Sequence, residues 1–367
     1  MKKTGLWASA LTVLVAAALV GSAAPAFAAT TAGPAIETSG YYNFVGVSPD
    51  GSIVASVAEY DELTIHNVTT GETNSYDVGY SAAAYPVISP DNAWVYIASY
   101  DPEEVIVVNA STGVVDRTIS VPFAAWTIAI TPDGDTLLVS EYAGHKVVKV
   151  DLTTDTVSSP LNLSSAAGYA WNICLTSDGS TLYVPGDYAN KIYAVDVETL
   201  AVTNSFHDSD RPQMCALDAS DTVYVADYET MAIRKFAADG SFIITEPGVV
   251  TDLYGFGVTC DSVIVGDDDN QTVAVLDAST LEVVENIATD AYTYSAVTSL
   301  ATNTVWFGGY YGSEGLQSVT GSTCAAPVTP ALASTGVSTF ELTAAGGLGF
   351  AALFAGAIVF VARRRKA

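Results

Sequence analysis

The sequence predicts an all-β repeat fold, and three observations support that prediction. A short turn motif, Ser/Thr-Pro-Asp-Gly in its clearest copies, recurs along the chain. Each copy stands between runs of apolar, aromatic and β-branched residues that have the length of a strand. No stretch shows helical periodicity before residue 340. These features favour sheets of short antiparallel strands over a helical repeat.

The spacing of the turns gives the number of repeats. Successive copies begin 41, 42, 45, 41, 42 and 40 residues apart, at Ser48, Ser89, Thr131, Thr176, Leu217, Thr259 and Ser299. Such a period is typical of propellers and solenoids. Seven units fit, and no remainder is large enough for a second domain. We therefore expect a seven-bladed β-propeller over residues 29–324.

The third unit shows what one repeat contains. Residues 126–134 (WTIAITPDG) run into the turn, where Pro132 and Gly134 take the places that a type I turn prefers for them. Three further β-rich runs follow at 136–142, 146–151 and 156–163. Four strands per repeat are the content of a propeller blade.

The ring must also be closed, because an open last blade would expose a strand edge. The seventh unit shows only three clear strands, at 294–299, 304–308 and 315–320. We expect residues 33–39, which precede the first unit, to supply its missing outer strand.

The N-terminus has the features of a secretory signal peptide. Lys2 and Lys3 precede an uncharged apolar stretch over 6–24, and residues 26–28 (AFA) have the small-x-small pattern of a cleavage site. We expect residues 1–28 to be removed. An uncleaved membrane anchor is the alternative.

The C-terminal segment has the features of a membrane and cell-wall anchor. Within residues 337–367, the uncharged stretch 342–362 is long enough to span a bilayer, and the basic tail 363–366 (RRRK) keeps its own end cytoplasmic. The linker 325–336 before it ends in Leu332, Ala333, Ser334, Thr335 and Gly336. This order of motif, apolar helix and basic tail resembles the LPXTG-type sortase sorting signal of Gram-positive bacteria.

That resemblance implies that a sortase cleaves after Thr335 and joins it to the peptidoglycan, leaving an extracellular, wall-anchored protein. Ala333 replaces the usual proline, as in the LAxTG variant associated with class E sortases of actinobacteria. A plain single-pass protein that keeps its helix is the alternative.

The charge balance narrows the partners. The chain has 13 basic and 40 acidic residues. Without residues 1–28 and 337–367, which hold six of the basic residues and Glu341, 7 basic and 39 acidic residues remain, a formal charge of −32. Such a surface repels nucleic acid and anionic lipid, so neither is an expected partner. We expect a soluble, monomeric extracellular domain.

Several segments carry a family resemblance. Residues 89–121 (SPDNAWVYIASYDPEEVIVVNASTGVVDRTISV) and 176–206 (TSDGSTLYVPGDYANKIYAVDVETLAVTNSF) resemble the YVTN family of β-propeller repeats of bacterial and archaeal surface proteins. Residues 222–236 (TVYVADYETMAIRKF) are similar to the related NHL pattern. The resemblance covers about residues 40–320 and implies the propeller, but not a chemistry, because many functions use this scaffold.

Four cysteines in an exported chain allow three full pairings. Cys174 and Cys215 occupy equivalent places in neighbouring repeats, so we expect them to point the same way around the ring and to stay buried as free thiols. Cys260 and Cys324 fall on the same face of adjacent blades, and we predict a disulfide between them. No cysteine spacing suits a zinc site.

The most informative residues fall on one face of the predicted disc. Six units begin their first strand with an aromatic residue, whereas the fifth has Pro212: Phe44, Tyr85, Trp126, Trp171, Tyr254 and Tyr294. On the same face an acid ends the second strand, beside a tyrosine in most units: Glu59, Glu141, Asp187, Asp227 and Asp267. Together they predict a collar of rings and carboxylates around one mouth of the channel.

The collar has two interpretations. As a binding surface, the rings supply stacking area and the carboxylates orient the hydroxyl groups or cations of a ligand. As a structural feature, the tyrosines pack between blades and the acids accept hydrogen bonds from turn amides. An aromatic residue preceded by Asn is common here in the YVTN pattern, so only the acids depart from it.

A calcium site is a weak further candidate. Asp267, Asp268, Asp269 and Asn270 place four oxygen-bearing side chains in one loop. The loop lacks the glycine and the distal glutamate of an EF-hand, so a solvated acidic turn is the alternative. We expect no other cofactor.

Catalytic motifs are missing from the sequence. It has three histidines, His66, His145 and His207, but no nucleophile elbow, no H-E-x-x-H and no phosphate-binding glycine loop. We expect no enzyme, but a surface binding, adhesion or structural module whose ligand is a glycan, a peptide or a wall polymer. The alternative is an extracellular propeller enzyme of the lyase or lactonase type that uses His145.

Overall fold

The structure, a computed structural model, describes residues 30–38, 41–59, 62–79, 83–163, 168, 171–206, 210–309 and 315–321. These residues form 29 strands and one short 3₁₀ helix, η1 (Asp187–Ala189). None of their helices is long and apolar enough to cross a membrane. The expected signal peptide, sorting motif and membrane segment lie outside the described residues.

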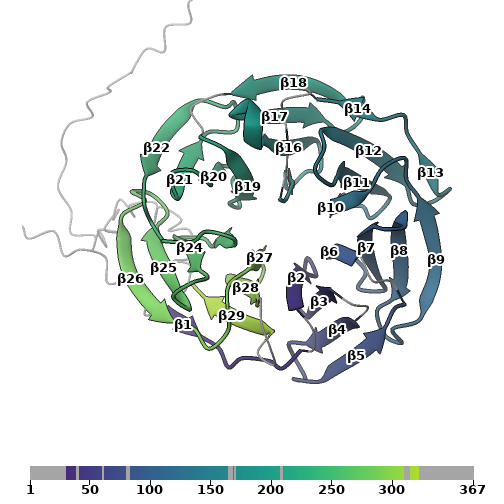
Figure 1. Ribbon diagram of the computed structural model, residues 1–367, viewed down its shortest axis with the longest axis horizontal. Helices are drawn as coiled ribbons and strands as arrows, with labels where there is room; N and C mark the ends of the chain where they lie inside the picture. Colours follow the sequence, from purple (N-terminus) through teal and green to yellow (C-terminus); the bar gives the residue numbers. More distant parts are fainter. Residues whose placement is uncertain are drawn as a thin grey trace, which may run out of the picture. The chain divides into compact units, whose positions relative to one another are not determined.

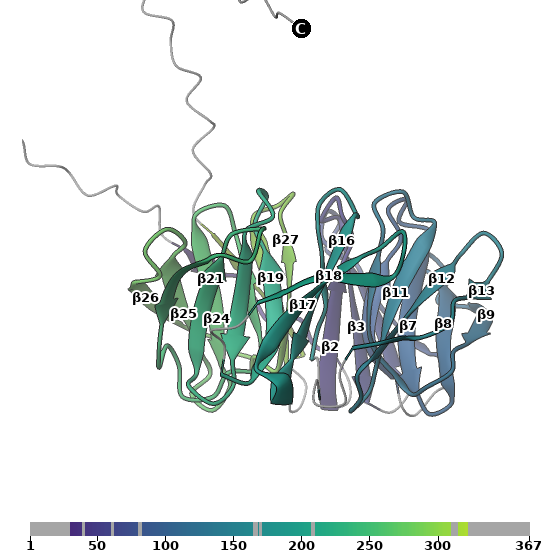
Figure 2. The same cartoon turned by 90° about the horizontal axis from the view of Figure 1, so that it is seen from above.

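The strands form seven sheets arranged as a ring (Figure 1). The strands follow one another in chain order from the axis outward, except that β1 is the outermost strand of the last sheet and β14 also pairs with β12 in the third. All of the strand pairs are antiparallel. The seven-bladed propeller predicted from the turn spacing is therefore confirmed. Seen from the side, the strands run between two faces of the ring (Figure 2).

The first four blades follow the repeat closely. Blade 1 contains β2 (Tyr41–Val47), β3 (Ile53–Glu59), β4 (Glu62–Asn67) and β5 (Thr73–Asp77). Blade 2 contains β6 (Ala83–Ile88), β7 (Trp94–Tyr100), β8 (Glu103–Asn109) and β9 (Val115–Ser120). Blade 3 contains β10 (Ala125–Ile130), β11 (Thr136–Glu141), β12 (Lys146–Asp151), and the short β13 (Thr156–Val157) and β14 (Leu161–Asn162), which both pair with β12. Blade 4 contains β15 (Cys174–Leu175), β16 (Thr181–Gly186), β17 (Lys191–Asp196) and β18 (Ala201–Phe206).

The remaining blades complete the ring. Blade 5 contains β19 (Pro212–Leu217), β20 (Val223–Asp227), β21 (Ala232–Phe236) and β22 (Phe242–Glu246). Blade 6 contains β23 (Phe256–Val258), β24 (Ser262–Asp267), β25 (Thr272–Asp277) and β26 (Val283–Ala288). Blade 7 contains β27 (Ser295–Ser299), β28 (Thr304–Gly308) and β29 (Leu316–Thr320), with β1 (Thr31–Ala32) as its outer strand.

An N-terminal segment closes the ring, as expected, but the strand begins earlier than predicted. β1 pairs with β29 through Thr31 and Ala32, ahead of the predicted 33–39. Within the predicted range the pairing continues irregularly, because the Gly33 amide donates to the Ser318 carbonyl at 2.8 Å and Ile36 forms a bridge to Leu316. Pro34 lacks an amide donor, which explains why the strand is interrupted there.

The repeated turn owes its stability to its own side chains. In blade 1 the Asp50 carboxylate accepts hydrogen bonds from the Ser48 hydroxyl at 2.7 Å and the Ser52 amide at 2.9 Å. The fourth residue of the turn has a positive φ, 73° at Gly51, which favours glycine or asparagine there. Because both of these partners lie two residues from Asp50, the sequence motif is enough to predict this turn. We call the face that carries these turns the turn face.

The core lies between neighbouring blades. Alternate residues along each strand point toward the next sheet, so that Val57 and Leu63 of blade 1 pack against Ile97 and Ile106 of blade 2. All four side chains are fully buried. Burial of each such side chain contributes about 1.5 to 3 kcal/mol, and the ring repeats this packing at every junction.

The prediction for the first pair of cysteines was wrong. Cys174 and Cys215 form a disulfide that joins the innermost strands of blades 4 and 5, with Cα atoms 6.0 Å apart. Equivalent residues of neighbouring blades come this close because the innermost strands converge on the axis. Cys324 lies outside the described residues, so its pairing with Cys260 stays a prediction.

Candidate functional site at the mouth of the channel

The six aromatic residues at the starts of the blades meet on the axis. Neighbouring ring centroids lie 4.8 to 6.1 Å apart in a closed circle of Phe44, Tyr85, Trp126, Trp171, Tyr254 and Tyr294. Two further contacts cross the circle, Phe44–Trp126 at 5.1 Å and Trp171–Tyr294 at 6.3 Å. We call these six residues the aromatic plug. The axial gap between the ribbons in Figure 1 is thus filled by side chains at this face.

In blades 1, 2 and 3 the first strand is irregular next to its ring. The pairing of β10 with β11 shifts register between Ala125 and Ile128, around Trp126. Blade 2 has a similar shift around Tyr85, and blade 1 has one just before Phe44. A bulge of this kind re-aims a side chain that a regular strand would direct toward a neighbouring sheet.

Four rings of the plug are buried and two are partly exposed. Phe44, Tyr85, Trp126 and Tyr294 are at most 8% exposed, whereas Trp171 and Tyr254 are partly exposed. Burial raises the pKa of the Tyr85 hydroxyl. Burial also raises the pKa of Tyr254, and the nearby Asp252 charge adds to that shift. At neutral pH both hydroxyls are therefore protonated and can donate hydrogen bonds.

A second tier of tyrosines stands over the plug, at the ends of the second strands. Tyr142 lies 4.8 Å from Trp126 and stacks on Tyr100 at 5.3 Å, yet it is 41% exposed. Tyr188, in η1, is 59% exposed. Tyr228 lies 6.5 Å from Tyr254. We call the plug and this tier together the aromatic mouth.

The predicted acid of blade 4 is neutralised by a cation from blade 5. Asp187 is fully buried, and both of its oxygens accept hydrogen bonds from Arg211, at 2.8 and 3.0 Å. The Gln213 amide adds a third hydrogen bond at 3.3 Å. The bonds to Asp187 raise the pKa of Arg211, so the guanidinium stays charged. Asp187 is thus an internal counter-ion and is withdrawn from any ligand.

Arg211 is the residue that the sequence reasoning missed. Its guanidinium lies between two tyrosine rings, 5.3 Å from the Tyr188 centroid and 5.0 Å from that of Tyr228. It occupies the sector where blade 5 has Pro212 in place of an aromatic residue. The signal was present, because Arg211 is one of only seven basic residues in 29–336 and stands at the single break in the aromatic series.

Two other predicted acids also have cationic partners. Asp227 is fully buried and pairs with Arg234 on the next strand. Burial raises its pKa to about 6, against the opposing effect of Arg234. Glu141 is 2.5 Å from the Lys146 ammonium and accepts a hydrogen bond from the His145 amide at 3.0 Å. Like Asp187, Glu141 is satisfied within the protein, whereas the buried Oδ1 of Asp227 has no hydrogen-bond partner among the described residues.

The acids of blade 6 form a separate group. Asp267 accepts hydrogen bonds from the Thr251 hydroxyl at 2.8 Å and from Asn270 at 3.0 Å, and Asp268 accepts from the Thr293 amide at 2.8 Å. Burial raises the pKa of Asp268 to about 6. Among the described residues, no group of three or more acidic, histidine or cysteine side chains is placed to hold a metal ion, and this holds for Asp267, Asp268 and Asp269 as well. Glu59 ends β3 on the same face.

The histidines do not gather at the mouth. His66 lies in β4, where its Nδ1 is 2.9 Å from the Thr73 hydroxyl. His145 lies in the loop after β11 and contributes its backbone amide to Glu141. His207 lies outside the described residues.

The opposite end of the channel has a cavity of about 290 Å³. Its walls are mainly apolar and include Ile173, Leu175, Phe256 and the Cys174–Cys215 pair. The Asn172 side chain holds the wall together, because it bonds both the amide and the carbonyl of Cys215, at 2.7 and 2.9 Å. The two ends therefore differ, with packed rings at one and a small apolar hollow at the other.

Comparisons with known proteins bear on the fold alone. No protein-family model matches the sequence, and a search of curated proteins found no match. Among solved structures 1828 chains match, as expected of a widespread scaffold. One is a chain of hydrazine synthase from Kuenenia stuttgartiensis, with a TM-score of 0.66 and 17% identity, where the match covers 80% of this chain and 99% of that chain. At that identity the likeness shows the propeller and leaves the activity open.

Proposed function

We propose that this chain is an exported, wall-anchored β-propeller that binds an extracellular ligand, a glycan, peptide or wall polymer, at its aromatic mouth. One observation carries the proposal. Tyr142 is 41% exposed on top of the aromatic cluster, and Tyr188, which Arg211 links to Tyr228, is 59% exposed. Aromatic surface gathered at one exposed place is typical of binding sites, because a ligand that covers it removes apolar area from water.

The neutralised acids indicate how such a ligand is held. Glu141, Asp187 and Asp227 are each paired with a cation of the protein, so a ligand meets ring faces, phenol hydroxyls and the Arg211 guanidinium. This surface suits the apolar faces of sugar rings or the apolar side chains of a peptide. Because little net charge is involved, binding should depend weakly on salt.

Export and anchoring rest on the sequence. The signal peptide, the motif over 332–336 and the basic tail support a wall-anchored product of sortase. The Cys174–Cys215 disulfide supports export, because disulfides persist in oxidising compartments. A sortase and the peptidoglycan are therefore the proposed partners.

A binding assay with matched variants tests the proposal. The full chain is titrated with peptidoglycan fragments, and with glycan and peptide arrays. Replacing Tyr142 and Tyr188 together by alanine should weaken binding by about tenfold or more, because anchor aromatics typically contribute over about 1 kcal/mol each. Phe242→Ala, which removes a ring that is 44% exposed on the outer strand of blade 5, should leave it unchanged.

Equal affinity for the wild type and the tyrosine variant would place the ligand elsewhere. The same preparation tests the enzymatic alternative. Turnover of a lactone or a lyase substrate that disappears in His145→Ala would replace the binding proposal by a catalytic one.

A further inference from the structure

A second cavity lies between blades 2 and 3 on the turn face, away from the aromatic mouth. Its volume is about 420 Å³, within the roughly 300 to 1,000 Å³ usual for small-molecule sites. Blade 2 contributes Asp91, Trp94, Tyr96 and Arg117, and the turn of blade 3 faces them. The repeat itself supplies the comparison that shows why this junction is open.

At the junction of blades 1 and 2 the corresponding space is filled by an asparagine. The Asn92 side chain, at the fourth position of its turn, donates to the second oxygen of Asp50 at 2.8 Å and to the Ser52 hydroxyl at 3.1 Å. In blade 3 the fourth position is Gly134. Both residues have a positive φ, 61° and 80°, so the backbones match and only the side chain is missing.

The missing side chain leaves a carboxylate oxygen open. Asp91 Oδ1 accepts from the Ser89 hydroxyl at 2.5 Å and the Ala93 amide at 3.0 Å, as Asp50 Oδ1 does in its own turn. Among the described residues none donates to Asp91 Oδ2. The Ser89 hydroxyl and the Ala93 amide lower the pKa of Asp91, so that oxygen is an ionised acceptor.

A tyrosine hydroxyl is left unsatisfied in the same way. At the equivalent positions of blades 4 and 5, the Tyr183 and Tyr224 hydroxyls donate to carbonyls in the outer turn of the following blade, at 2.9 and 3.2 Å. Tyr96 is only 4% exposed, and its hydroxyl has no hydrogen-bond partner in the described part of the chain. Tyr96 lines the cavity together with Leu152 and Thr153. These two residues belong to the outer turn of blade 3, which corresponds to the turns that Tyr183 and Tyr224 reach.

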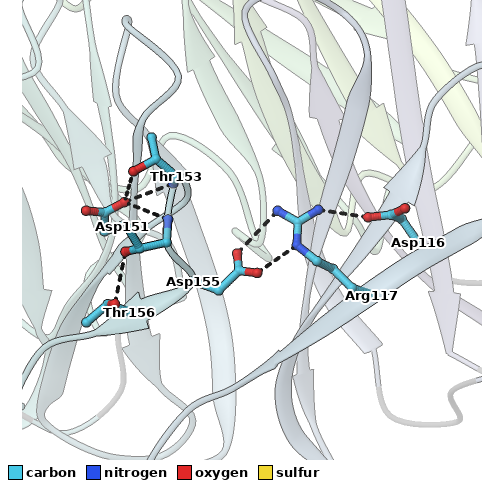
Figure 3. A network of polar contacts seen from close by, with 7 residues as sticks. Asp116, Arg117, Asp151, Thr153, Asp155 and Thr156 are labelled. Carbon is cyan, nitrogen blue, oxygen red and sulfur yellow. Dashed lines mark hydrogen bonds and ion pairs between the residues drawn. The ribbon is translucent and has the colours of Figure 1, made fainter.

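Arg117 fixes one wall of the cavity. It reaches from β9 to the turn of blade 3, where its Nε and Nη2 donate to Asp155 at 3.0 and 3.3 Å (Figure 3). Nη1 donates to Asp116 at 2.9 Å, and the guanidinium lies 6.0 Å from the Trp94 centroid. Asp116 and Asp155 together more than balance the single positive charge of Arg117, so Asp91, Asp133 and Asp135 make the site net negative.

We propose that this cavity binds a single neutral pyranose unit. The carboxylates accept hydrogen bonds from the sugar hydroxyls, and the Tyr96 hydroxyl can donate or accept one. Trp94 and Pro90 offer apolar surface to the C–H face of the sugar. The net negative wall disfavours anionic sugars. This site is independent of the aromatic mouth.

The test uses methyl glycosides of glucose, galactose, mannose and N-acetylglucosamine as probes. Saturation-transfer NMR with the full chain detects binding, and titration gives the affinity. At least one probe should bind, and its uronate counterpart should bind at least about tenfold more weakly, since desolvated charge repulsion costs over about 1 kcal/mol.

Gly134→Asn restores the side chain that Asn92 provides one blade earlier, and it should abolish the signal. Its matched control is Gly71→Asn, the same substitution at a positive φ of 75° where no atom lies within 4 Å. Tyr96→Phe keeps the ring and the packing and should weaken binding about fivefold or more, because it removes one hydrogen bond worth about 1 kcal/mol. Saturation transfer from none of the probes, or full affinity in Gly134→Asn and Tyr96→Phe, would overturn the proposal.

Discussion

At the scale of single residues, Arg211 connects two acids and two tyrosine rings at the mouth. It pairs with the buried Asp187, approaches Glu229 at 3.6 Å, and separates the rings of Tyr188 and Tyr228. Its own φ of 57° is unusual for a residue with a long side chain. The contacts with Asp187 and the two rings stabilise that conformation.

Loss of Arg211 should be costly. In Arg211→Met the Asp187 carboxylate would stay buried without a counter-ion, and we expect the free energy of unfolding to fall by about 3 to 5 kcal/mol. Urea denaturation measures it. The double variant Asp187→Asn/Arg211→Met should recover part of the loss, because no buried charge remains; equal destabilisation in both variants would contradict the account.

Residue-level features were predictable where the partners are close in sequence. The Asp50 turn follows from its motif, because Ser48 and Ser52 are two residues away. The Arg211–Asp187 pair joins different blades across 24 residues, and only the ring geometry brings it together. The sequence therefore predicted acids at the mouth but could not show that three of them are paired with cations.

At the scale of elements, two contacts hold the ring together at particular junctions. The Cys174–Cys215 disulfide joins blades 4 and 5 where β15 has only two residues. Strand β1 closes blade 7 with residues from the other end of the propeller. The pairing of the cysteines was mispredicted because rotational symmetry was applied without the convergence of the inner strands. The closing strand was predicted a few residues too far along the sequence, because β1 is short and its pairing is irregular.

Removal of the disulfide should destabilise the propeller measurably. The bridge closes a loop with a sequence separation of 41 residues, for which chain entropy predicts about 2 to 4 kcal/mol. The variant Cys174→Ala/Cys215→Ala should lose that amount in urea denaturation. Dithiothreitol should lower the free energy of unfolding of the wild type toward that of the variant. Equal free energies of unfolding for the two proteins under oxidising conditions would refute the role of the bridge.

Removal of the closing strand should also lower the stability of the whole ring. Deleting residues 30–38 leaves β29 with an open edge and uncovers Leu316 and Val319, both fully buried by the intact closure. We expect a single transition at a midpoint lowered by roughly 10 °C or more, since each 1 kcal/mol shifts the midpoint of a domain this large by about 2 to 4 °C. An unchanged melting curve would show that β1 does not close the ring.

At the scale of the whole molecule, charge is distributed unevenly. All seven basic residues of 29–336 lie in blades 2 to 5, so blades 6, 7 and 1 carry acids alone. Composition predicted the acidic surface but not this asymmetry, which appears only when the residues are assigned to blades. The seven-fold architecture itself was predictable, because it follows from a local motif at regular spacing.

The buried acids give the protein a distinct dependence on pH. The pKa of Asp227 and that of Asp268 rise from 3.8 to about 6, so both favour the folded state below pH 3.8 and lose that contribution as the pH rises to about 6. The pKa values of the turn residues Asp91 and Asp133 are lowered by hydrogen bonds, so these residues stabilise the fold above 3.8 and lose that effect at lower pH. Stability should therefore peak at about pH 4 to 5.

Thermal unfolding between pH 3 and pH 8 measures this profile. Asp268→Asn keeps an acceptor for the Thr293 amide and should flatten the decline between pH 5 and pH 7. A maximum at neutral pH or above would contradict the raised pKa values of the buried acids.

The central claim is that the aromatic mouth binds a ligand, and a crystal structure soaked with peptidoglycan fragments tests it most directly. The account predicts ligand density against Tyr142, Tyr188 and the partly exposed face of Trp171, with Arg211 still paired to Asp187. Fragments bound at saturating concentration on another face, with the mouth unchanged, would contradict it.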